Sequence, residues 1–271
     1  MFPLAGKTFP TSRAELAQQI RDAMNDVLTL PTKGESVTAE GGSFPSVKKL
    51  KINLNGASVS ATEPPPKPKP TGKRQPGIEV EHLEVTGHPI QYESRKLELD
   101  LKGKGLRFDF GRDKKGQPLL ILADAEEGHV KAKISKADIQ ALALEAARFF
   151  AKKQGVKIED LDLTLTSDGP RSVAAEARVK AKKLVMSGVI VIKGKLVVDD
   201  ELNATVSDLS VDGEGMVGSM AAPMLQKLIK PYNGTEIPLV AFSLGDVALR
   251  DLKITVKDSV QVTADFGKAL A

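Results

Sequence analysis

Three histidines are the side chains of this chain that could bind a transition metal or transfer a proton near neutral pH. His82 and His88 lie in one segment that alternates like a β-strand, but the alternation changes parity at Leu83, so the two rings are expected on opposite faces. No carboxylate lies near them at a spacing suited to zinc. His129 follows Gly128 at a predicted strand start and is interpreted as a turn residue. We therefore expect no metal site.

The acidic run Asp199, Asp200 and Glu201 could bind Ca²⁺ or close a hairpin. It lacks the alternating Asp/Asn and Gly pattern of a calcium loop, so a tight turn is favoured. The chain contains no cysteine, which excludes disulfides, thiolate metal sites and a cysteine nucleophile. It also lacks a GxSxG elbow, an SxxK motif with its companions and a phosphate loop. We expect neither enzymatic activity nor a cofactor.

The composition is that of an ordinary globular protein with few aromatic side chains. Apolar residues make up 41%, charged residues 27% and aromatic residues 4% of the chain. The net charge of +4 is a small basic excess, and aromatic stacking platforms are scarce, so no nucleic-acid partner is expected. The opening segment, MFPLAGKTFP, lacks the apolar run of a signal peptide. We expect a cytoplasmic location and leave peripheral membrane association and the oligomeric state open.

Residues 135–154, SKADIQALALEAARFFAKKQ, predict a helix that is apolar around most of its circumference. Its polar side chains gather on one narrow stripe. Apolar surface costs about 25 cal/mol per Å² when left in water. Something must therefore enclose most of this helix, and the rest of the chain supplies strands. Two interpretations stay open, a dry core under a sheet and an apolar groove for a ligand. The stripe comprises Asp138, Glu145, Arg148 and Lys152.

The start of the chain predicts a second helix that is apolar on one face only. Ser12 and Glu15 form a capping box, and Pro31 ends the run. A one-sided helix requires a partner surface, so we predict that it docks on a sheet or over the mouth of a groove. The docking face comprises Leu16, Ile20, Met24 and Val27.

Most of the remaining chain alternates with a period of two, which predicts antiparallel strands with one wet face. The alternating stretches cover residues 78–134, 161–211 and 247–266. Residues 216–230 interrupt them with a third, apolar helix, which Pro223 is expected to bend or restart. Few βαβ units are visible, so the sequence favours an α+β fold over a parallel sheet.

Residues 62–77, TEPPPKPKPTGKRQPG, are rich in proline and basic residues and predict a mobile segment without a packed core. Proline has no N–H to donate, so this segment is not expected to join a β-ladder. It is either an interdomain linker or a long hairpin loop, and its charges allow transient contact with an anionic membrane surface. The predicted organisation is a helix and strand in residues 1–61, packed on the main domain, then this segment, then a main domain of residues 78–271.

Three stretches of the main domain resemble the LmeA-like bacterial family, which is similar to the tubular lipid-binding (TULIP) proteins. They are ISKADIQALALEAARFF (134–150), the hairpin VIVIKGKLVVDDELNATVSDLSVDGEGMVGS (189–219) and the closing segment YNGTEIPLVAFSLGDVALRDLKITVKDSVQVTADF (232–266). The resemblance implies a TULIP-like α+β fold, in which a long curved antiparallel β-sheet wraps around a mostly apolar helix. Here an N-terminal amphipathic helix is added.

The resemblance also implies a non-enzymatic protein that binds phospholipid or another acyl-chain ligand in a groove between helix and sheet, with a carrier role left open. Methionine suits such a groove because its thioether side chain is flexible and polarizable. The alternative is a structural or interaction module whose β core is filled by its own side chains and which binds partners through sheet edges or the proline-rich segment. The implied groove residues are Ile139, Leu142, Ala143, Ala146, Phe149, Phe150, Met216, Met220, Met224 and Leu228.

Overall fold

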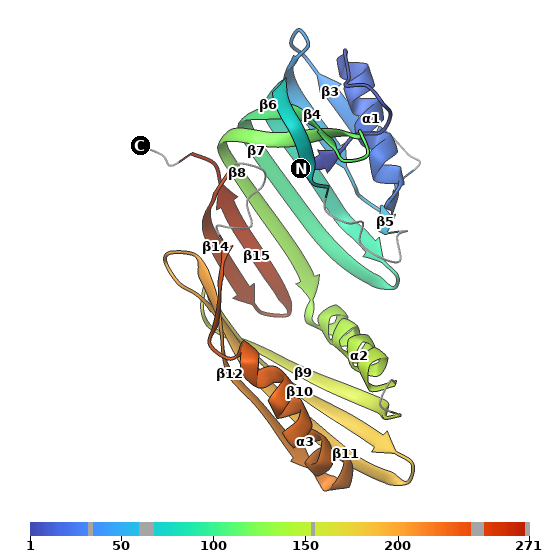
Figure 1. The fold of residues 1–271 in the computed structure, drawn as a ribbon, viewed down its shortest axis with the longest axis vertical. Helices are drawn as coiled ribbons and strands as arrows, with labels where there is room; N and C mark the ends of the chain where they lie inside the picture. The colour runs from blue at the N-terminus through green and yellow to red at the C-terminus, as the bar shows by residue number, and fades with distance from the viewer. Residues whose placement is uncertain (32–34, 60–67, 153–154, 240–246, 269–271) are drawn as a thin grey trace. The chain divides into compact units, whose positions relative to one another are not determined.

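The computed structural model describes residues 1–31, 35–59, 68–152, 155–239 and 247–268, which form two compact units (Figure 1). Unit 1 comprises Met1–Lys133, Val240–Asp251 and Val262–Ala271, and unit 2 comprises Ile134–Leu239 and Leu252–Gln261. Strands predominate over helices in both units, which gives an α+β fold. The division differs from the predicted one, because it falls inside the span 78–271, and unit 1 extends across residues 62–77.

Unit 1 contains one helix, α1 (Arg13–Asn25), and a large mixed sheet in its described part. The strands are β1 (Phe2–Pro3), β2 (Leu28–Thr29), β3 (Val37–Glu40), β4 (Ser46–Asn53), β5 (Ser58–Val59), β6 (Pro70–Tyr92), β7 (Arg95–Asp113), β8 (Pro118–Ser135), β14 (Leu249–Val256) and β15 (Ser259–Phe266). The main strand order is β14-β15-β8-β7-β6-β4-β3. Strands β14 and β15 contribute residues to both units.

The long antiparallel hairpin of β6 and β7 organises the sheet of unit 1. Strand β4 joins β6 in parallel, with Ser46 opposite Glu79 and Asn53 opposite Thr86. This pairing places residues before and after the proline-rich segment in the same sheet. The two parts of the chain therefore share one core.

The proline-rich segment differs from its prediction. Strand β6 begins at Pro70 and pairs with β7 from there on, with register shifts between Thr71 and Gln75 and between Pro76 and Ile78. Strand β4 joins β6 only from Glu79 onward, so the preceding part of β6 lies at an edge of the described sheet, where a missing N–H is tolerated. The prediction that residues 62–77 stay out of a ladder is thus wrong from Pro70 onward. Residues 62–67 lie outside the described residues.

Helix α1 docks on unit 1, as its one-sided pattern predicts. At its start the amide of Glu15 donates to Oγ of Ser12 at 3.2 Å, and Oε2 of Glu15 accepts from the amide of Thr11 at 2.8 Å. These bonds satisfy N–H groups that the helix cannot pair itself. The apolar face then enters the main cluster of the unit, with exposed fractions of 0% for Leu16, 2% for Ile20 and 5% for Met24, while Val27 is half-buried.

Unit 2 consists, in its described part, of a five-stranded antiparallel sheet and two helices. Its elements are α2 (Lys136–Lys152), β9 (Lys157–Gly169), β10 (Ser172–Lys183), β11 (Met186–Val198), β12 (Asn203–Glu214), α3 (Gly215–Ile229), the 3-10 turn η1 (Lys230–Tyr232) and β13 (Thr235–Pro238). The strand order is β13-β12-β11-β10-β9. Both helices pack on one apolar cluster and so cover the same face of the sheet.

Helix α2 covers the sheet with one side only. The amide of Asp138 donates to Oγ of Ser135 at 3.0 Å, which caps the helix start. Ala143 and Ala147 pack against the apolar cluster. None of the helix residues is buried. The predicted helix is confirmed, whereas its enclosure by a curved sheet stays a prediction.

Helix α3 confirms the predicted apolar helix of residues 216–230. It continues through Pro223, so the helix does not restart there. Proline cannot donate to the carbonyl of Ser219, but Ser219 is exposed and water can satisfy that oxygen. None of the helices in the described part of the chain has the length and apolarity needed to cross a membrane.

The acidic run Asp199–Glu201 forms the turn between β11 and β12, as predicted. The amide of Asn203 donates to Oδ1 of Asp199 at 2.7 Å. This backbone hydrogen bond is the main reason that the pKa of Asp199 lies below its ordinary value. The acidic side chains therefore stabilise a turn by local hydrogen bonding.

Candidate functional site

Helix α3 lies close to the sheet because three glycines meet where it packs on β11 and β12. A Cβ atom on Gly188, Gly213 or Gly218 would collide with backbone atoms of the neighbouring element. Near the other end of the helix, the amide of Val211 donates to Oε1 of Gln226 at 2.7 Å. These contacts fix the rotation of the helix, so its opposite face points to solvent.

The outward face of α3 is apolar. Met216, Met220, Met224 and Leu228 recur at every fourth position, which places them in one row along the helix. Their exposed fractions are 60%, 69%, 52% and 57%. We call this row the α3 stripe. The structure therefore brings four of the predicted groove residues together, but on an exposed helix face. Exposed apolar patches of this kind mark interaction sites.

The six predicted residues on α2 do not share one environment. Ala143 packs against the core of unit 2, on the side of the helix that meets the sheet, and its assignment to a groove stays a prediction. Phe149 and Phe150 are 62% and 68% exposed, and their rings meet edge to face with centroids 5.6 Å apart. The remaining three are Ile139 and Leu142, which are half-buried, and Ala146, which is exposed.

The sequence did not predict the strong exposure of two apolar residues in unit 2. Leu184 and Val185, 84% and 94% exposed, form the two-residue turn between β10 and β11, since Lys183 pairs with Met186. The sequence predicts a strand that starts at Leu184. One signal could have revealed the turn: one alternating run ends and another begins at this point. The turn is hard to recognise from the sequence because it lacks Gly, Asn and Asp, the residues that such turns normally contain.

A cavity of about 600 Å³ lies in unit 1, and charged side chains form much of its lining. Nζ of Lys49 lies 3.0 Å from Oε2 of Glu84, and this hydrogen bond raises the pKa of Lys49 and lowers that of Glu84. Nδ1 of His129 lies 2.6 Å from Oδ1 of Asp265. Because these groups pair with each other, the cavity presents no field of one sign, and we assign it no ligand. Its charged lining comprises Lys49, Lys102, Lys104, Arg250, Glu84, Glu127 and Asp265.

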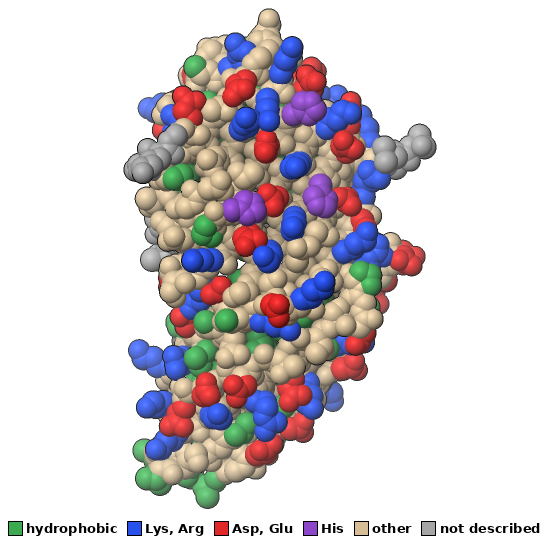
Figure 2. Space-filling view, turned by 180° about the vertical axis from the view of Figure 1, so that it is seen from behind, with side chains coloured by type: hydrophobic (Ala, Val, Ile, Leu, Met, Phe, Trp, Pro, Cys, Tyr) green, Lys and Arg blue, Asp and Glu red, His purple; other side chains and the backbone are tan. Residues whose placement is uncertain are grey.

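The predicted change of parity in β6 is confirmed, but its consequence for the histidines is wrong. Ile78 and Val80 are buried, and Leu83 packs on the same cluster with the other parity. The change lies before or at His82, so His82 and His88 follow it with the same parity. Figure 2 shows all three histidines of the chain on one face of unit 1.

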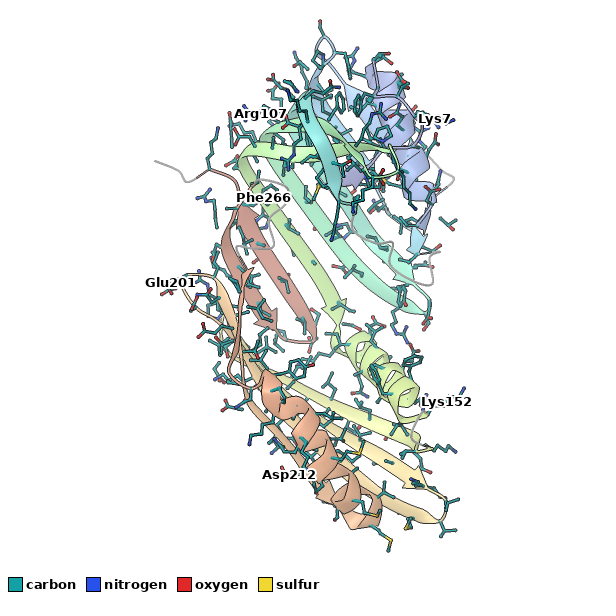
Figure 3. All side chains as sticks on the ribbon, viewed as in Figure 1. Lys7, Arg107, Lys152, Glu201, Asp212 and Phe266 are labelled. Carbon is teal, nitrogen blue, oxygen red and sulfur yellow. The ribbon has the colours of Figure 1, made fainter. Side chains whose placement is uncertain are left out.

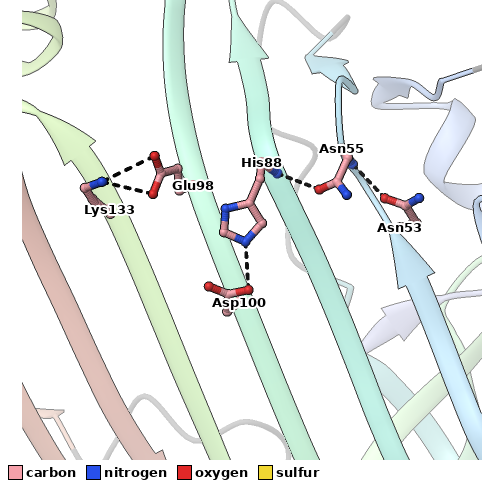
Figure 4. Close-up of polar contacts among 6 residues, drawn as sticks. All are labelled: Asn53, Asn55, His88, Glu98, Asp100 and Lys133. Atoms are coloured by element: carbon pink, nitrogen blue, oxygen red, sulfur yellow. Dashed lines mark hydrogen bonds and ion pairs between the residues drawn. The ribbon is translucent and has the colours of Figure 1, made fainter.

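His88 belongs to one of two separate groups of polar contacts on the sheet of unit 1 (Figure 4). Its Nε2 lies 2.8 Å from Oδ1 of Asp100, and its amide donates to Oδ1 of Asn55 at 2.7 Å. Farther along, Nζ of Lys133 donates to both oxygens of Glu98 at 3.1 and 3.3 Å. Within the described ranges, no three metal-ligating side chains come together. These contacts therefore connect neighbouring strands to one another.

Comparison of the chain with models of protein families, with curated proteins and with solved structures found no match. A function for this chain must therefore be argued from its own surfaces. In the described part of the chain, the α3 stripe is a row of four large apolar side chains whose exposure folding alone does not require.

Proposed function

We propose that this protein binds lipid acyl chains through the α3 stripe. The observation that supports the proposal is the exposure of four apolar side chains, between 52% and 69%, on one face of a helix whose other face is held against the sheet. Complete burial of such a side chain contributes about 1.5 to 3 kcal/mol, so covering four half-exposed ones is worth roughly 4 kcal/mol. An acyl chain is an occupant that gains this free energy without requiring polar partners.

The dimensions and chemistry of the stripe favour lipid over protein as the occupant. At a rise of 1.5 Å per residue, the stripe from Met216 to Leu228 is about 18 Å long. This length is close to one leaflet of a bilayer, whose hydrocarbon core measures about 30 Å across both leaflets. The stripe contains neither Trp nor Arg, which dominate the binding energy of protein interfaces. Methionine side chains adapt to a ligand of variable shape.

Helix α2 extends the proposal to a second apolar surface of unit 2. Phe150 is 68% exposed, and Ile139 and Leu142 are only half-buried, although the unit has a core of its own. The finer form of the proposal follows the tubular lipid-binding proteins, with an acyl chain lying along α2 beneath a curved sheet. Ala146→Phe tests this form, because Ala146 is exposed and a larger side chain there leaves the core intact. Loss of lipid binding in this variant would support a chain along α2.

The main experiment measures the affinity of the purified protein for a fluorescent fatty acid added below its micelle concentration. The test variant is Met220→Gln with Met224→Gln, which keeps the length and helix propensity of both side chains while removing their apolar character. We expect binding to weaken by about tenfold or more, because about 2 kcal/mol of burial is lost. The matched control is Ser219→Gln with Lys227→Gln, which changes two exposed positions beside the stripe.

Two results would contradict the proposal. The first is wild-type protein that does not bind the probe, and the second is equal affinity in the test and control variants. If the wild-type protein instead self-associates through the stripe, sedimentation of the Met220→Gln, Met224→Gln variant would show a smaller species. That result would favour the interaction module. A carrier role requires a further step, which transfer of the probe between donor and acceptor vesicles would measure.

A further inference from the structure

We propose that one end of unit 2 docks on the surface of an anionic phospholipid bilayer. This surface, which we call the docking end, consists of an apolar tip and a basic rim. The proposal goes beyond the binding of a single acyl chain and rests on the proposed function only in that both surfaces include Met216. The tip comprises Leu184, Val185 and Met216, and the rim comprises Lys152, Lys157, Lys182 and Lys183.

The turn residues of the tip, Leu184 and Val185, suit insertion into a membrane better than they suit the conformation of the turn. Leu184 and Val185 are 84% and 94% exposed at the two central positions of the hairpin. Leu184 has a φ of 56°, a conformation that favours Gly or Asn over branched side chains. A hairpin selected only for stability would carry Gly at position 184, because the first of the two central residues has the positive φ. Leu184 and Val185 therefore lower the stability of the turn and leave two apolar side chains exposed.

Strand pairing brings the start of α3 to the same end of the unit. Lys182 and Ser187 face each other next to the turn, and Gly188 forms a bridge with Gly215, the first residue of α3. Met216, which is 60% exposed, follows directly. Figure 1 shows the β10–β11 turn and the start of α3 at the same end of unit 2, and Figure 2 shows hydrophobic side chains gathered there. The turn and the helix therefore form one apolar tip.

The rim consists of lysines that the fold does not use. Lys182 lies opposite Lys157 on β9, a pairing of like charges that costs stability in a sheet. Lys183 adjoins the turn, and Lys152 lies at the C-terminal end of α2 (Figure 3). All four rim lysines are exposed, and none of them forms an ion pair with another described residue.

Two carboxylates near the rim, those of Asp160 and Glu214, pair with bases outside it. Oδ2 of Asp160 lies 3.1 Å from Nζ of Lys180, and this hydrogen bond lowers the pKa of Asp160. Oε1 of Glu214 lies 3.2 Å from Arg178. The rim thus keeps its positive charge beside an apolar tip. Lysines around exposed apolar residues match a membrane surface, since the ammonium groups reach anionic headgroups while the apolar side chains enter the acyl boundary.

The test is co-sedimentation of the full chain with two kinds of vesicle, phosphatidylcholine alone and equal parts of phosphatidylcholine and phosphatidylglycerol. We expect binding to the mixed vesicles and at least about fivefold weaker binding to the neutral ones, with a decrease as salt is raised. The first variant is Leu184→Gly with Val185→Asn, which supplies the turn sequence that the backbone favours. It should retain or raise the melting temperature and lose about tenfold or more of its vesicle binding.

The second variant, Lys182→Gln with Lys183→Gln, should lose the preference for anionic vesicles while keeping the weak binding to neutral ones. Its control is Lys114→Gln with Lys115→Gln, which removes two exposed lysines from the β7–β8 turn of unit 1 and should bind as the wild type does. Unchanged binding in either docking-end variant overturns the proposal. Wild-type protein that binds neither vesicle also overturns it. A change of oligomeric state in the Leu184→Gly, Val185→Asn variant without a change in vesicle binding overturns it too.

Fatty-acid binding and vesicle binding, measured on both double variants, distinguish a failure of the docking end from a failure of the α3 stripe. The Leu184→Gly, Val185→Asn variant should still bind the monomeric fluorescent fatty acid with wild-type affinity, because Met220 and Met224 are intact. The Met220→Gln, Met224→Gln variant should lose the fatty acid and retain most of its vesicle binding. Loss of both activities in both variants would mean that the stripe and the tip act as one surface, which overturns the separate docking end.

Discussion

Helices α1 and α3 both carry an apolar face with methionine on it, but only α1 buries that face. Met24 of α1 is 5% exposed, whereas Met220 of α3 is 69% exposed. The outer face of α1 is polar, with Gln18 donating to Asp22 at 2.7 Å. The outer face of α3 carries the stripe, because small residues, with Gly218 among them, make its contact with the sheet.

This difference separates apolar residues that folding requires from those that it does not. The apolar side chains of α1 fill the core of unit 1, so folding alone accounts for them. The core of unit 2 uses the inner residues Val217 and Ala222 of α3 and does not include Met216, Met220 or Met224. The large side chains on α3 are therefore available for binding.

The largest expected effect comes from placing charge on the buried face of α1. Leu16→Asp with Ile20→Asp puts two carboxylates into a site that is at most 2% exposed, and should lower the free energy of unfolding by roughly 4 kcal/mol or more. Urea unfolding followed by circular dichroism would measure the loss. Ala14→Asp, at an exposed position of the same helix, is the control and should be nearly neutral. Equal stability of the two proteins would show that α1 does not dock.

A somewhat smaller loss is expected where α3 meets the sheet. Gly218→Val introduces side-chain atoms that collide with the carbonyl of Val189 and the backbone of Gly213, so we expect a loss of about 3 kcal/mol. Thermal unfolding would measure it. Ser219→Val, one position along and exposed, should cost only about 0.5 kcal/mol through helix propensity. A tolerated valine at position 218 would mean that α3 is not held in the rotation that exposes the stripe.

The comparison is sharpest when the same substitution is made in both helices. Met24→Ala removes a buried side chain and should cost about 2 to 4 kcal/mol, whereas Met220→Ala should change stability by less than about 0.5 kcal/mol. Only Met220→Ala should weaken binding of the fluorescent fatty acid. Chemical unfolding and probe titration on both proteins test the pair. Similar losses of stability would contradict the distinction between a filled core and an available surface.

The smallest effect concerns the helix starts and depends on pH. A hydrogen bond from the amide of Thr11 lowers the pKa of Glu15 below its ordinary value of 4.5, whereas Glu214 at the start of α3 makes no capping bond with its side chain. A lowered pKa in the folded state means that the ionised form of Glu15 stabilises α1 at neutral pH. This contribution is lost as the pH falls through the folded-state pKa.

The test compares the melting temperatures of wild type and Glu15→Gln as the pH is lowered from neutrality. The wild type should be slightly more stable near neutral pH, and the difference should shrink once the pH falls below the ordinary value of 4.5. If the difference in melting temperature between the two proteins does not vary with pH, Glu15 stabilises the helix start through packing and not through its charge.

Much of the fold could be predicted from local signals. The capping box at Ser12 located α1, and the apolar runs located α2 and α3 to within a few residues. The proline-rich segment could not be predicted in the same way. Pro70 joins a strand because β6 lies at an edge there, and edge position is a property of the assembled sheet.

The candidate site was predicted only in part. Met216, Met220, Met224 and Leu228 were named, since their types and spacing are visible along the chain, but the choice between a groove and an exposed face depends on which neighbours cover them. Ala143 was also named, but its contact with the core of unit 2 depends on which side of α2 meets the sheet, and the sequence does not show that.

The sequence by itself determined that thiol chemistry is absent and where the apolar helices lie. The absence of cysteine, the scarcity of aromatic residues and the period of the apolar positions are properties of single residues and their spacing. The tertiary structure alone decided exposure. The close approach at Gly188, Gly213 and Gly218 brings together residues far apart in the chain, and it turns the stripe outward. Exposure depends on such long-range contacts, and no local pattern contains them.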